Sequence, residues 1–354
     1  MTPGVGLNTW KDIGLLNREI KPYVEYARRG WKVKILTYDK DAIPELPEGI
    51  ETIRFPSPYF LWFLHLTHEN LGKWADVIKT NQSNWAIFYT HAARFWKKPI
   101  LLRCGYVQGE YLETTMGFTP KVKLYQCLEA RAFREATYCQ LPTEELSVWV
   151  QKRYEVSQEK ILVIPNFVDT DIFKPIEGIQ KKAKSIISVG RLSRVKQFDL
   201  LIRACAEIPG CTVTIVGEGS DRQKLERLAK DLKVSLNLPG NQPNEELPTM
   251  LQEHEIFVIT SKREGHPKAL IEAMACGMPC IGSKVRGIEN VIKHERNGLI
   301  VELNKEDIKN GILKLGENKE LSYKLGRTAR QYVEEKYSFL KCFAEEYKII
   351  KSLI

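Results

Sequence analysis

The second half of the chain alternates short apolar runs with amphipathic stretches. The apolar runs include SIISVG, TVTIVG and EIFVIT, and the stretches that separate them include QFDLLIRACAEI, DRQKLERLAKDL and PKALIEAMACG. Runs that are apolar at every position are typical of parallel strands buried on both faces, and the stretches between them have helical spacing. The pattern predicts an α/β domain with a doubly wound parallel sheet. Ligands of such sheets bind at the carboxyl ends of the strands.

The first half has a similar but less regular pattern, with the runs WKVKILTYD and PILLRCGY and a predicted long helix over 121–135. It predicts a second α/β domain, with a hinge near 170–183. After Glu302 the pattern is helical, and the last stretch places apolar residues on one face that must be buried, which favours packing across the domain junction. We therefore expect an N-terminal domain over 1–170, a C-terminal domain over 171–336 and a returning helix over 337–354.

The amino terminus lacks an expected element. Gly4 and Gly6 are typical of the phosphate-facing turn that follows the first strand of such a domain, yet only Met1 to Pro3 precede them. Either the first strand is missing, or these glycines belong to an ordinary terminus. A domain without its central strand would leave two neighbouring strands unpaired and its core open, so we expect an upstream start.

Composition narrows the class of protein. The chain has 354 residues, 43% hydrophobic and 27% charged, which suits a two-domain globular protein and excludes a disordered or collagen-like chain. It has no signal-peptide pattern and no apolar run of about 18 residues, so we expect a cytoplasmic protein. The net charge of +9 favours acidic partners without choosing among them. Eight cysteines without CxxC pairs are expected to be buried free thiols: Cys104, Cys127, Cys139, Cys205, Cys211, Cys276, Cys280 and Cys342.

The segment SKREGHPKALIEAMACGMPCIGS has the strongest functional pattern. Pro267 suits the first position of a helix that ends before Gly277. Cations around the start of this helix, Arg263 and Lys268 among them, oppose the helix dipole and so destabilise the helix. A diphosphate bound at the N-terminus would offset that unfavourable interaction. The backbone N–H groups that would hold it belong to Gly265, His266, Lys268 and Ala269. The alternative is that these lysines only face water.

Two carboxylates accompany this helix. Glu264 lies in the loop before it and Glu272 in its second turn, so both could reach an extended ligand. Carboxylates accept hydrogen bonds from sugar hydroxyls, so one could hold a hexose and the other a ribose. The spacing alone is weak, because glutamate is common on helix surfaces.

The loop after the first strand of the second half supplies cations near the predicted start of that helix. Arg191 and Lys196, in SVGRLSRVKQFDLL, would neutralise phosphate charge opposite the helix N-terminus. Gly217 and Gly219 in IVGEGSD allow close approach of backbone to a ligand, although a tight turn is the simpler interpretation.

In order and spacing, SVGRLSRVKQFDLLIRA, IVGEGSDRQKLE and SKREGHPKALIEAMACGMPCIGS resemble the signature of retaining glycosyltransferases of family four. IPNFVDTDIF and NGLIV also resemble segments of that family. The resemblance implies the GT-B architecture, in which two Rossmann-like doubly wound domains face each other across a cleft and a C-terminal helix returns to the first domain.

The resemblance also implies roles for single residues. Arg191 and Lys196 would hold the donor diphosphate, Glu264 the transferred sugar and Glu272 the ribose. The backbone from Gly265 to Ala269 would hold phosphates and sugar. Gly240, with its neighbours Asn241 and Gln242, would border the base. Gly217, Gly4 and Gly6 are further candidates for binding the donor.

The chain departs from the family at one strand end. The family often has a histidine after a strand of its first domain, whereas ADVIKTNQSN has Asn81 and Gln82 there. His91 lies in the following helix and is interpreted as an ordinary helix residue. Asp169 and Asp171 form a DxD, which we interpret as turn residues, and we expect neither a metal nor another cofactor.

Two aromatic segments stay open to interpretation. YFLWFLHL at 59–66 and RFWKK at 94–98 suit either core packing or peripheral contact with a membrane. Core packing is preferred.

We therefore expect a metal-independent retaining glycosyltransferase that moves a hexose or N-acetylhexosamine from a UDP- rather than GDP-sugar to a glycan or lipid-linked acceptor, in surface polysaccharide assembly. Nucleic acid is not an expected partner. The rivals are a nicotinamide dehydrogenase, a GT-B sugar-nucleotide epimerase and a non-catalytic subunit of a synthase. A dehydrogenase would need a GxGxxG motif, and the segment that begins with Gly4 and Gly6 lacks the third glycine.

Overall fold

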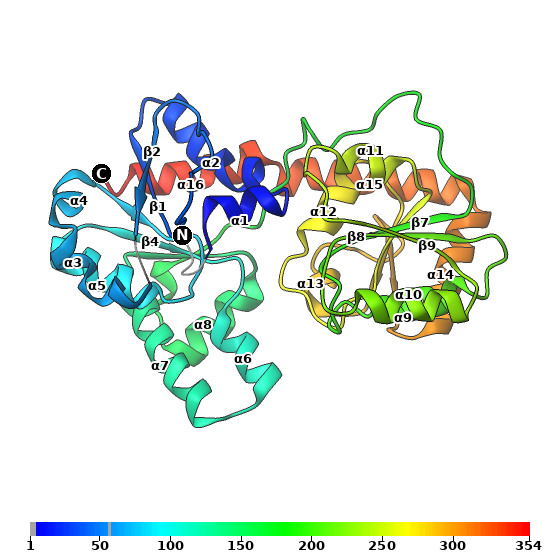
Figure 1. Cartoon of the computed structure of the whole chain (residues 1–354), viewed down its shortest axis with the longest axis horizontal. Coiled ribbons are helices and arrows are strands. Elements are labelled where there is room, and N and C mark those ends of the chain that lie inside the picture. Colours follow the sequence, from blue (N-terminus) through cyan, green and yellow to red (C-terminus); the bar gives the residue numbers. More distant parts are fainter. Residues whose placement is uncertain (1–4, 56–57) are drawn as a thin grey trace. The chain divides into compact units, whose positions relative to one another are not determined.

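The computed structural model describes residues 5–55 and 58–354, which divide into two compact units (Figure 1). Unit 1 comprises the chain up to Asn166 together with Phe343–Ile354, and unit 2 comprises Phe167–Cys342. The division lies a few residues before the predicted position, and the chain returns to unit 1 at Phe343 rather than at residue 337. Each unit is an α/β structure, and the strands described in it all pair in parallel.

Unit 2 has one six-stranded parallel sheet, in the order β12-β11-β10-β7-β8-β9. The chain begins at the centre of this sheet, adds two strands on one side and then crosses to the other side. This is the predicted doubly wound topology. Its strands are β7 (Ser185–Val189), β8 (Thr212–Val216), β9 (Ser235–Gly240), β10 (Ile256–Ile259), β11 (Cys280–Ser283) and β12 (Leu299–Val301).

Helices cover both faces of this sheet (Figure 1). Side chains alternate between the two faces of a strand, so Ile186 and Ile187 pack into opposite cores. All four residues of β10 are buried, which explains why the strand is apolar at every position. The helices are α9 (Phe198–Cys205), α10 (Arg222–Asp231), α11 (Leu247–Gln252), α12 (Lys268–Ala275), α13 (Arg286–Glu289), α14 (Lys305–Glu317) and α15 (Lys319–Tyr337).

The described residues of unit 1 contain two separate parallel sheets where the sequence predicted one. One pairs β1 (Val33–Thr37) with β2 (Ile50–Arg54). The other runs in the order β3 (Ile78–Lys79), β4 (Ile100–Arg103), β5 (Tyr138–Leu141) and β6 (Ile161–Val163). The helical segments of this part of the chain are α1 (Leu7–Asp12), α2 (Leu16–Arg28), η1 (Pro58–Phe63), α3 (Leu64–Thr67), α4 (Glu69–Trp74), α5 (Ala86–Trp96), α6 (Gln108–Met116), α7 (Pro120–Glu135), α8 (Glu144–Tyr154) and η2 (Gln158–Lys160).

The last helix, α16 (Phe339–Lys351), carries the chain back into unit 1 and packs on α2. The ring of Phe343 lies 4.9 Å from that of Tyr26, so the predicted apolar face is buried there. The Tyr26 hydroxyl donates to the Glu346 carboxylate at 2.8 Å, and Glu346 also forms a buried ion pair with Lys79. Burial acts to raise the pKa of Glu346, but the nearby Lys79 and Arg103 cations outweigh it and lower that pKa.

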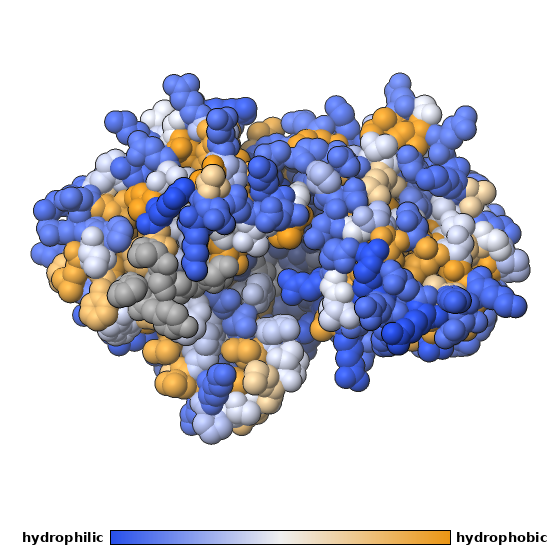
Figure 2. Space-filling view, viewed as in Figure 1, coloured by the Kyte–Doolittle hydropathy of each residue, from blue (hydrophilic) through white to orange (hydrophobic). Residues whose placement is uncertain are grey.

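The aromatic segment after residue 58 is divided between core and surface. Leu61 and Leu64 are buried in the core of unit 1, as the preferred interpretation expected. Trp62, Phe63 and Leu66 are 45%, 50% and 60% exposed. Figure 2 shows hydrophobic side chains at the surface over α3 and α5. None of the helices described is both long and apolar enough to cross a bilayer.

The cysteines are free thiols, and seven of the eight are buried. Cys127 differs from the prediction because its position on α7 leaves it exposed.

Candidate functional site

The loops that follow β7 and β10 meet in unit 2. These strands are neighbours at the centre of the sheet, where the chain changes direction, and loops at such a switch point form ligand sites. Lys196, after β7, places its Nζ 2.6 Å from Oε1 of Glu264, after β10. The side chains are 23% and 12% exposed, so both are accessible in part to a ligand.

Backbone and hydroxyl contacts hold these loops together. The Thr260 hydroxyl donates to the carbonyl of Lys196 at 2.9 Å, and the Lys262 N–H donates to the carbonyl of Val195 at 2.8 Å. The Ser261 hydroxyl donates to Oε1 of Glu264 at 2.6 Å, so that oxygen accepts from both Ser261 and Lys196. The sequence reasoning missed Ser261, although a serine just after a buried strand is a signal for such a role.

Arg191 lies on the same loop and is exposed. Among the described residues its guanidinium has no hydrogen-bond or ion-pair partner, unlike the ammonium of Lys196. The buried Leu192 anchors the loop, and its N–H donates to the carbonyl of Glu218 at 2.9 Å. Of the two cations predicted to bind the diphosphate, Lys196 is therefore paired, and Arg191 has no such partner among the described residues.

Gly217 and Gly219 allow the loops after β7 and β8 to pack closely. A Cβ on Gly217 would lie 2.2 Å from the carbonyl oxygen of Gly190, and one on Gly219 would lie 2.2 Å from that of Leu192. Gly217 also has a φ of +139°, which side chains with a Cβ rarely adopt. Packing of one loop on the other thus accounts for both glycines.

The loop after β9 adjoins this arrangement. The N–H of Gly217 donates to the carbonyl of Gly240 at 2.8 Å, and Gly240 has a φ of +84°. Gln242 is partly buried and its amide donates to the carbonyl of Pro239 at 2.9 Å, whereas Asn241 is exposed. The three loops after β7, β8 and β9 are therefore linked by backbone contacts.

Helix α12 begins one residue later than predicted. Pro267 is the N-cap with extended backbone, and Lys268 is the first helical residue. The first bond back to the cap runs from the Ile271 N–H to the Pro267 carbonyl at 3.2 Å, so Ile271 is the first residue of α12 whose N–H bonds to a carbonyl four residues earlier. Gly265 is exposed and Ala269 is partly buried.

Glu272 is only 3% exposed, on the second turn of α12. The Asn244 amide, from the loop after β9, donates to Oε1 of Glu272 at 3.3 Å. Sequence reasoning did not identify Asn244, because 28 residues separate the two and neither belongs to a shared local pattern.

His266 lies just before α12 and is 7% exposed. Its ring lies 4.9 Å from the ring of Tyr337. Burial, and secondly the charge of Lys268, lowers the pKa of His266 to about 4, so the ring is neutral at pH 7. It can take part in hydrogen bonds but adds no positive charge to the site.

Gly287, in α13, is a further residue that the sequence reasoning missed. A Cβ at this position would lie 2.2 Å from the carbonyl oxygen of Glu264 and 2.5 Å from that of Gly265. The absence of a side chain at Gly287 lets α13 press on the loop that carries Glu264.

The predicted residues near the amino terminus lie in unit 1. Gly4 falls outside the described residues. Gly6 precedes α1, and a Cβ on it would lie 2.0 Å from a carboxylate oxygen of Asp39. That carboxylate accepts the N–H groups of Leu7 at 2.6 Å and Asn8 at 3.1 Å. Gly6 therefore permits an acidic side chain to cap α1.

The remaining residues singled out by sequence have local partners. Asn81 accepts from the Arg103 guanidinium at 2.9 Å, and Gln82 accepts from the Gly105 N–H at 3.1 Å. His91 stacks on Trp62 with ring centroids 5.3 Å apart, and burial lowers its pKa.

The DxD pair lies in a turn. Asp169 accepts the N–H of Asp171 at 3.2 Å, which is the geometry of a turn stabilised by an aspartate side chain. In the part of the chain that the structure describes, no group of three or more His, Cys, Asp and Glu side chains is arranged to hold a metal.

One family model matches a segment that lies within unit 2. Residues 169–332 match the sequence model of the family described as Glycosyl transferases group 1. Over 352 residues the chain is 27% identical to the UDP-Gal:alpha-D-GlcNAc-diphosphoundecaprenol alpha-1,3-galactosyltransferase of Escherichia coli, covering 93% of this chain and 86% of that enzyme.

Solved structures share the fold along most of the chain. The sucrose-phosphate synthase of Thermosynechococcus elongatus has a TM-score of 0.83 at 19% identity, covering 96% of this chain and 93% of that one. Anabaena HepE, in complex with UDP and glucose, has a TM-score of 0.77 at 17% identity and covers 94% of each chain. The α/β fold is therefore of the GT-B glycosyltransferase type.

Proposed function

We propose, on the premise that residues 169–332 match the group 1 glycosyl transferases, that this chain is a retaining enzyme acting on a nucleoside-diphosphate sugar. The sugar transferred is a hexose or N-acetylhexosamine, and UDP is preferred to GDP as the carrier. The acceptor is a glycan or a lipid-linked glycan, and the product belongs to surface polysaccharide assembly.

One observation carries the proposal, namely the contact between Lys196 and Glu264 at the switch point of the unit 2 sheet. A cation and a carboxylate at that position are the two kinds of group that a sugar diphosphate requires. The ammonium binds phosphate oxygens, and the carboxylate accepts hydrogen bonds from sugar hydroxyls. When the donor binds, Lys196 and Glu264 give up their contact with each other and contact the donor instead.

Arg191 completes the charge that the diphosphate requires. Its exposed guanidinium and the Lys196 ammonium neutralise the charge that develops on the departing nucleoside diphosphate. The N–H groups that precede Ile271 at the start of α12 bind the same anion without adding a side chain. We expect transfer to proceed in the presence of a metal chelator.

Glu272 and Asn244 fix the other end of the donor. The Glu272 carboxylate is already oriented by the Asn244 amide, so it can accept the ribose hydroxyls with little further ordering. The bond between the anomeric carbon and the diphosphate oxygen breaks and leaves an electron-poor sugar. The acceptor hydroxyl attacks the anomeric carbon from the face that the diphosphate leaves, and its proton passes to an oxygen of the departing diphosphate.

The preference for UDP and for a lipid-linked acceptor is supported by the names of relatives. The similar enzyme of Escherichia coli is named for UDP-Gal and for a diphosphoundecaprenol acceptor, and HepE was solved with UDP and glucose. Exposed Trp62, Phe63 and Leu66 on unit 1 suit the approach of an acceptor that resides in a membrane.

Thermal unfolding with UDP-, GDP-, ADP- and dTDP-sugars in a chelator tests the donor site. A donor present at about 100 times its dissociation constant adds about 2.7 kcal/mol to stability. We expect a shift with UDP-sugars that Glu272→Ala abolishes and that Glu317→Ala, at an exposed position on α14, leaves intact. A folded protein that no nucleotide sugar shifts would contradict the proposal. Binding without transfer to any glycan acceptor would favour a non-catalytic subunit.

A further inference from the structure

The carboxylate of Glu264 uses one of its two oxygens in its contacts with the protein. Oε1 accepts from the Lys196 ammonium at 2.6 Å and from the Ser261 hydroxyl at 2.6 Å. Among the described residues, Oε2 has no hydrogen-bond partner. Because the side chain is 12% exposed, Oε2 remains able to accept a hydrogen bond from a ligand.

The two partners of Oε1 differ in how firmly they are held. Ser261 is fully buried, and its carbonyl accepts from the Ser283 hydroxyl at 2.6 Å. Ser283 ends β11, the strand that pairs with β10, so Ser261 is tied to the sheet. Lys196 has a long flexible side chain that is 23% exposed. Ser261 therefore stays on Oε1 when Lys196 moves away.

The backbone of the loop that carries Glu264 is also fixed. The Lys262 N–H donates to the Val195 carbonyl at 2.8 Å, and α13 presses on the Glu264 carbonyl at Gly287. The remaining freedom of the carboxylate is rotation about the bonds of its own side chain. The hydrogen bond from Ser261 restricts that rotation before a ligand binds, and such preorganisation favours binding.

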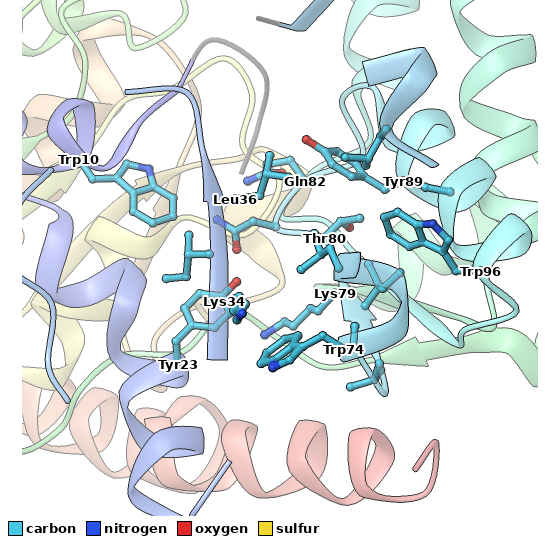
Figure 3. A pocket seen from close by; sticks show the side chains of 18 residues that line it. Trp10, Tyr23, Lys34, Leu36, Trp74, Lys79, Thr80, Gln82, Tyr89 and Trp96 are labelled. Carbon is cyan, nitrogen blue, oxygen red and sulfur yellow. The ribbon is translucent and has the colours of Figure 1, made fainter. Parts of the chain in front are cut away.

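The cavity of unit 1 has no equivalent group (Figure 3). Its lining is mostly apolar and aromatic, with Trp10, Trp74 and Trp96, and no aspartate or glutamate is among the described residues that line it. The Lys79 ammonium at its wall is already paired with Glu346. A carboxylate that accepts from a sugar hydroxyl is therefore supplied by unit 2 and not by this cavity.

We propose that Ser261 is a positioning residue that orients Glu264 toward the sugar of the donor. In the proposed function, on which this assignment rests, Lys196 leaves Glu264 for the diphosphate. Ser261 then holds Oε1, and Oε2 accepts a hydroxyl of the sugar. The part of the binding that depends on the sugar requires the Ser261 hydroxyl, whereas binding of the nucleotide part does not.

Three forms of the whole chain test this role, namely the wild type, Ser261→Ala and Ser185→Ala. Ser185→Ala is the matched control, because it also removes a buried serine hydroxyl, one that donates to the Lys182 carbonyl. Ser185 begins β7, so it lies at the edge of the sheet opposite the site. Titration calorimetry in a chelator compares UDP with UDP-glucose, UDP-galactose and UDP-N-acetylglucosamine. The UDP-sugar that binds most tightly is then measured in its 3-, 4- and 6-deoxy forms.

We expect Ser261→Ala to leave the dissociation constant of UDP within about twofold of the wild type. Binding of the UDP-sugar should weaken by about tenfold or more, because the carboxylate that accepts from the sugar is no longer oriented. In the wild type, the deoxy sugar that lacks the hydroxyl accepted by Glu264 binds less tightly than its parent. That difference should disappear in Ser261→Ala and persist in Ser185→Ala.

A Ser261→Ala protein that keeps the wild-type preference for UDP-sugar over UDP would overturn the proposal. If that variant does not fold, Ser261→Cys replaces it, since a thiol fills nearly the same space and is only a weak donor. A cysteine variant with the wild-type preference would overturn the proposal in the same way. A wild-type protein that binds neither UDP nor any UDP-sugar would contradict the proposed function itself, so the two failures are distinguishable.

Discussion

The Nζ of Lys196 lies 2.6 Å from Oε1 of Glu264, although 68 residues separate them in the chain. Each side chain follows one of the two central strands of the unit 2 sheet, and hydrogen bonds from Thr260 and Ser261 fix the loops that carry them. The pair holds a cation and a carboxylate ready for a ligand that needs both. Its geometry is the basis for the first prediction.

Lys196→Ala is expected to lower kcat/KM for transfer by about 100-fold or more, because a positive charge aimed at the leaving diphosphate is lost. The protein should remain folded by circular dichroism. The matched control is Lys262→Ala, which removes an exposed cation from the neighbouring loop. Equal kinetics for the two variants would remove Lys196 from the donor site.

Gly217→Ala is expected to destabilise the protein by more than about 1 kcal/mol, since a Cβ would approach the Gly190 carbonyl and the φ is positive. Gly316→Ala is the control, because a Cβ there meets nothing within 4 Å and lies in helix α14, where alanine is favoured by about 1 kcal/mol. Urea unfolding compares the two. Similar stabilities would show that the loops after β7 and β8 can move apart freely.

His266 should make stability depend on mildly acidic pH. Its pKa is about 4 in the folded protein, below the ordinary 6.5, so the unfolded chain binds the proton more readily. The stability linked to the neutral His266 ring is fully present above pH 6.5 and is lost as the pH falls toward 4. It amounts to about 3 kcal/mol, at 1.36 kcal/mol per pKa unit. His266→Phe keeps a ring against Tyr337 and should flatten stability over this range. An unchanged pH profile in that variant would contradict the assignment.

The buried pair of Glu346 and Lys79 predicts a second acid effect. The pKa of Glu346 is lowered, so its contribution is present above the unfolded pKa of the carboxyl group and is lost as the pH falls through the folded value. Glu346→Gln leaves Lys79 buried without an anion and should cost about 3 to 5 kcal/mol at neutral pH.

The control for that pair replaces both partners. Lys79→Met with Glu346→Leu removes both charges and should be far less destabilising than Glu346→Gln alone. Its stability should also fall less between neutral and acidic pH. Equal losses in the single and double variants would mean that packing, rather than charge, dominates this contact.

Local sequence predicted the positions of candidate residues in unit 2 where these lie close to their own strand or helix. The loop residues Arg191, Lys196 and Glu264 follow strands that are apolar at every position, so their place at the carboxyl edge of the sheet was evident. Asn244 and Gly287 were missed because their roles come from contacts with Glu272 and Glu264 that form only when distant loops pack. The predicted helix boundary was one residue off, since Pro267 is the N-cap of α12 and not its first residue.

The sequence by itself determined that the chain forms parallel strands and helices with a polar loop site, because burial on two faces imposes a continuous apolar pattern on each strand. Only the tertiary structure decided that the described strands of unit 1 form two sheets, since pairing between distant strands cannot be read from the sequence of either strand. It also decided that Lys196 meets Glu264, because the order of strands in a sheet is set by packing rather than by order along the chain.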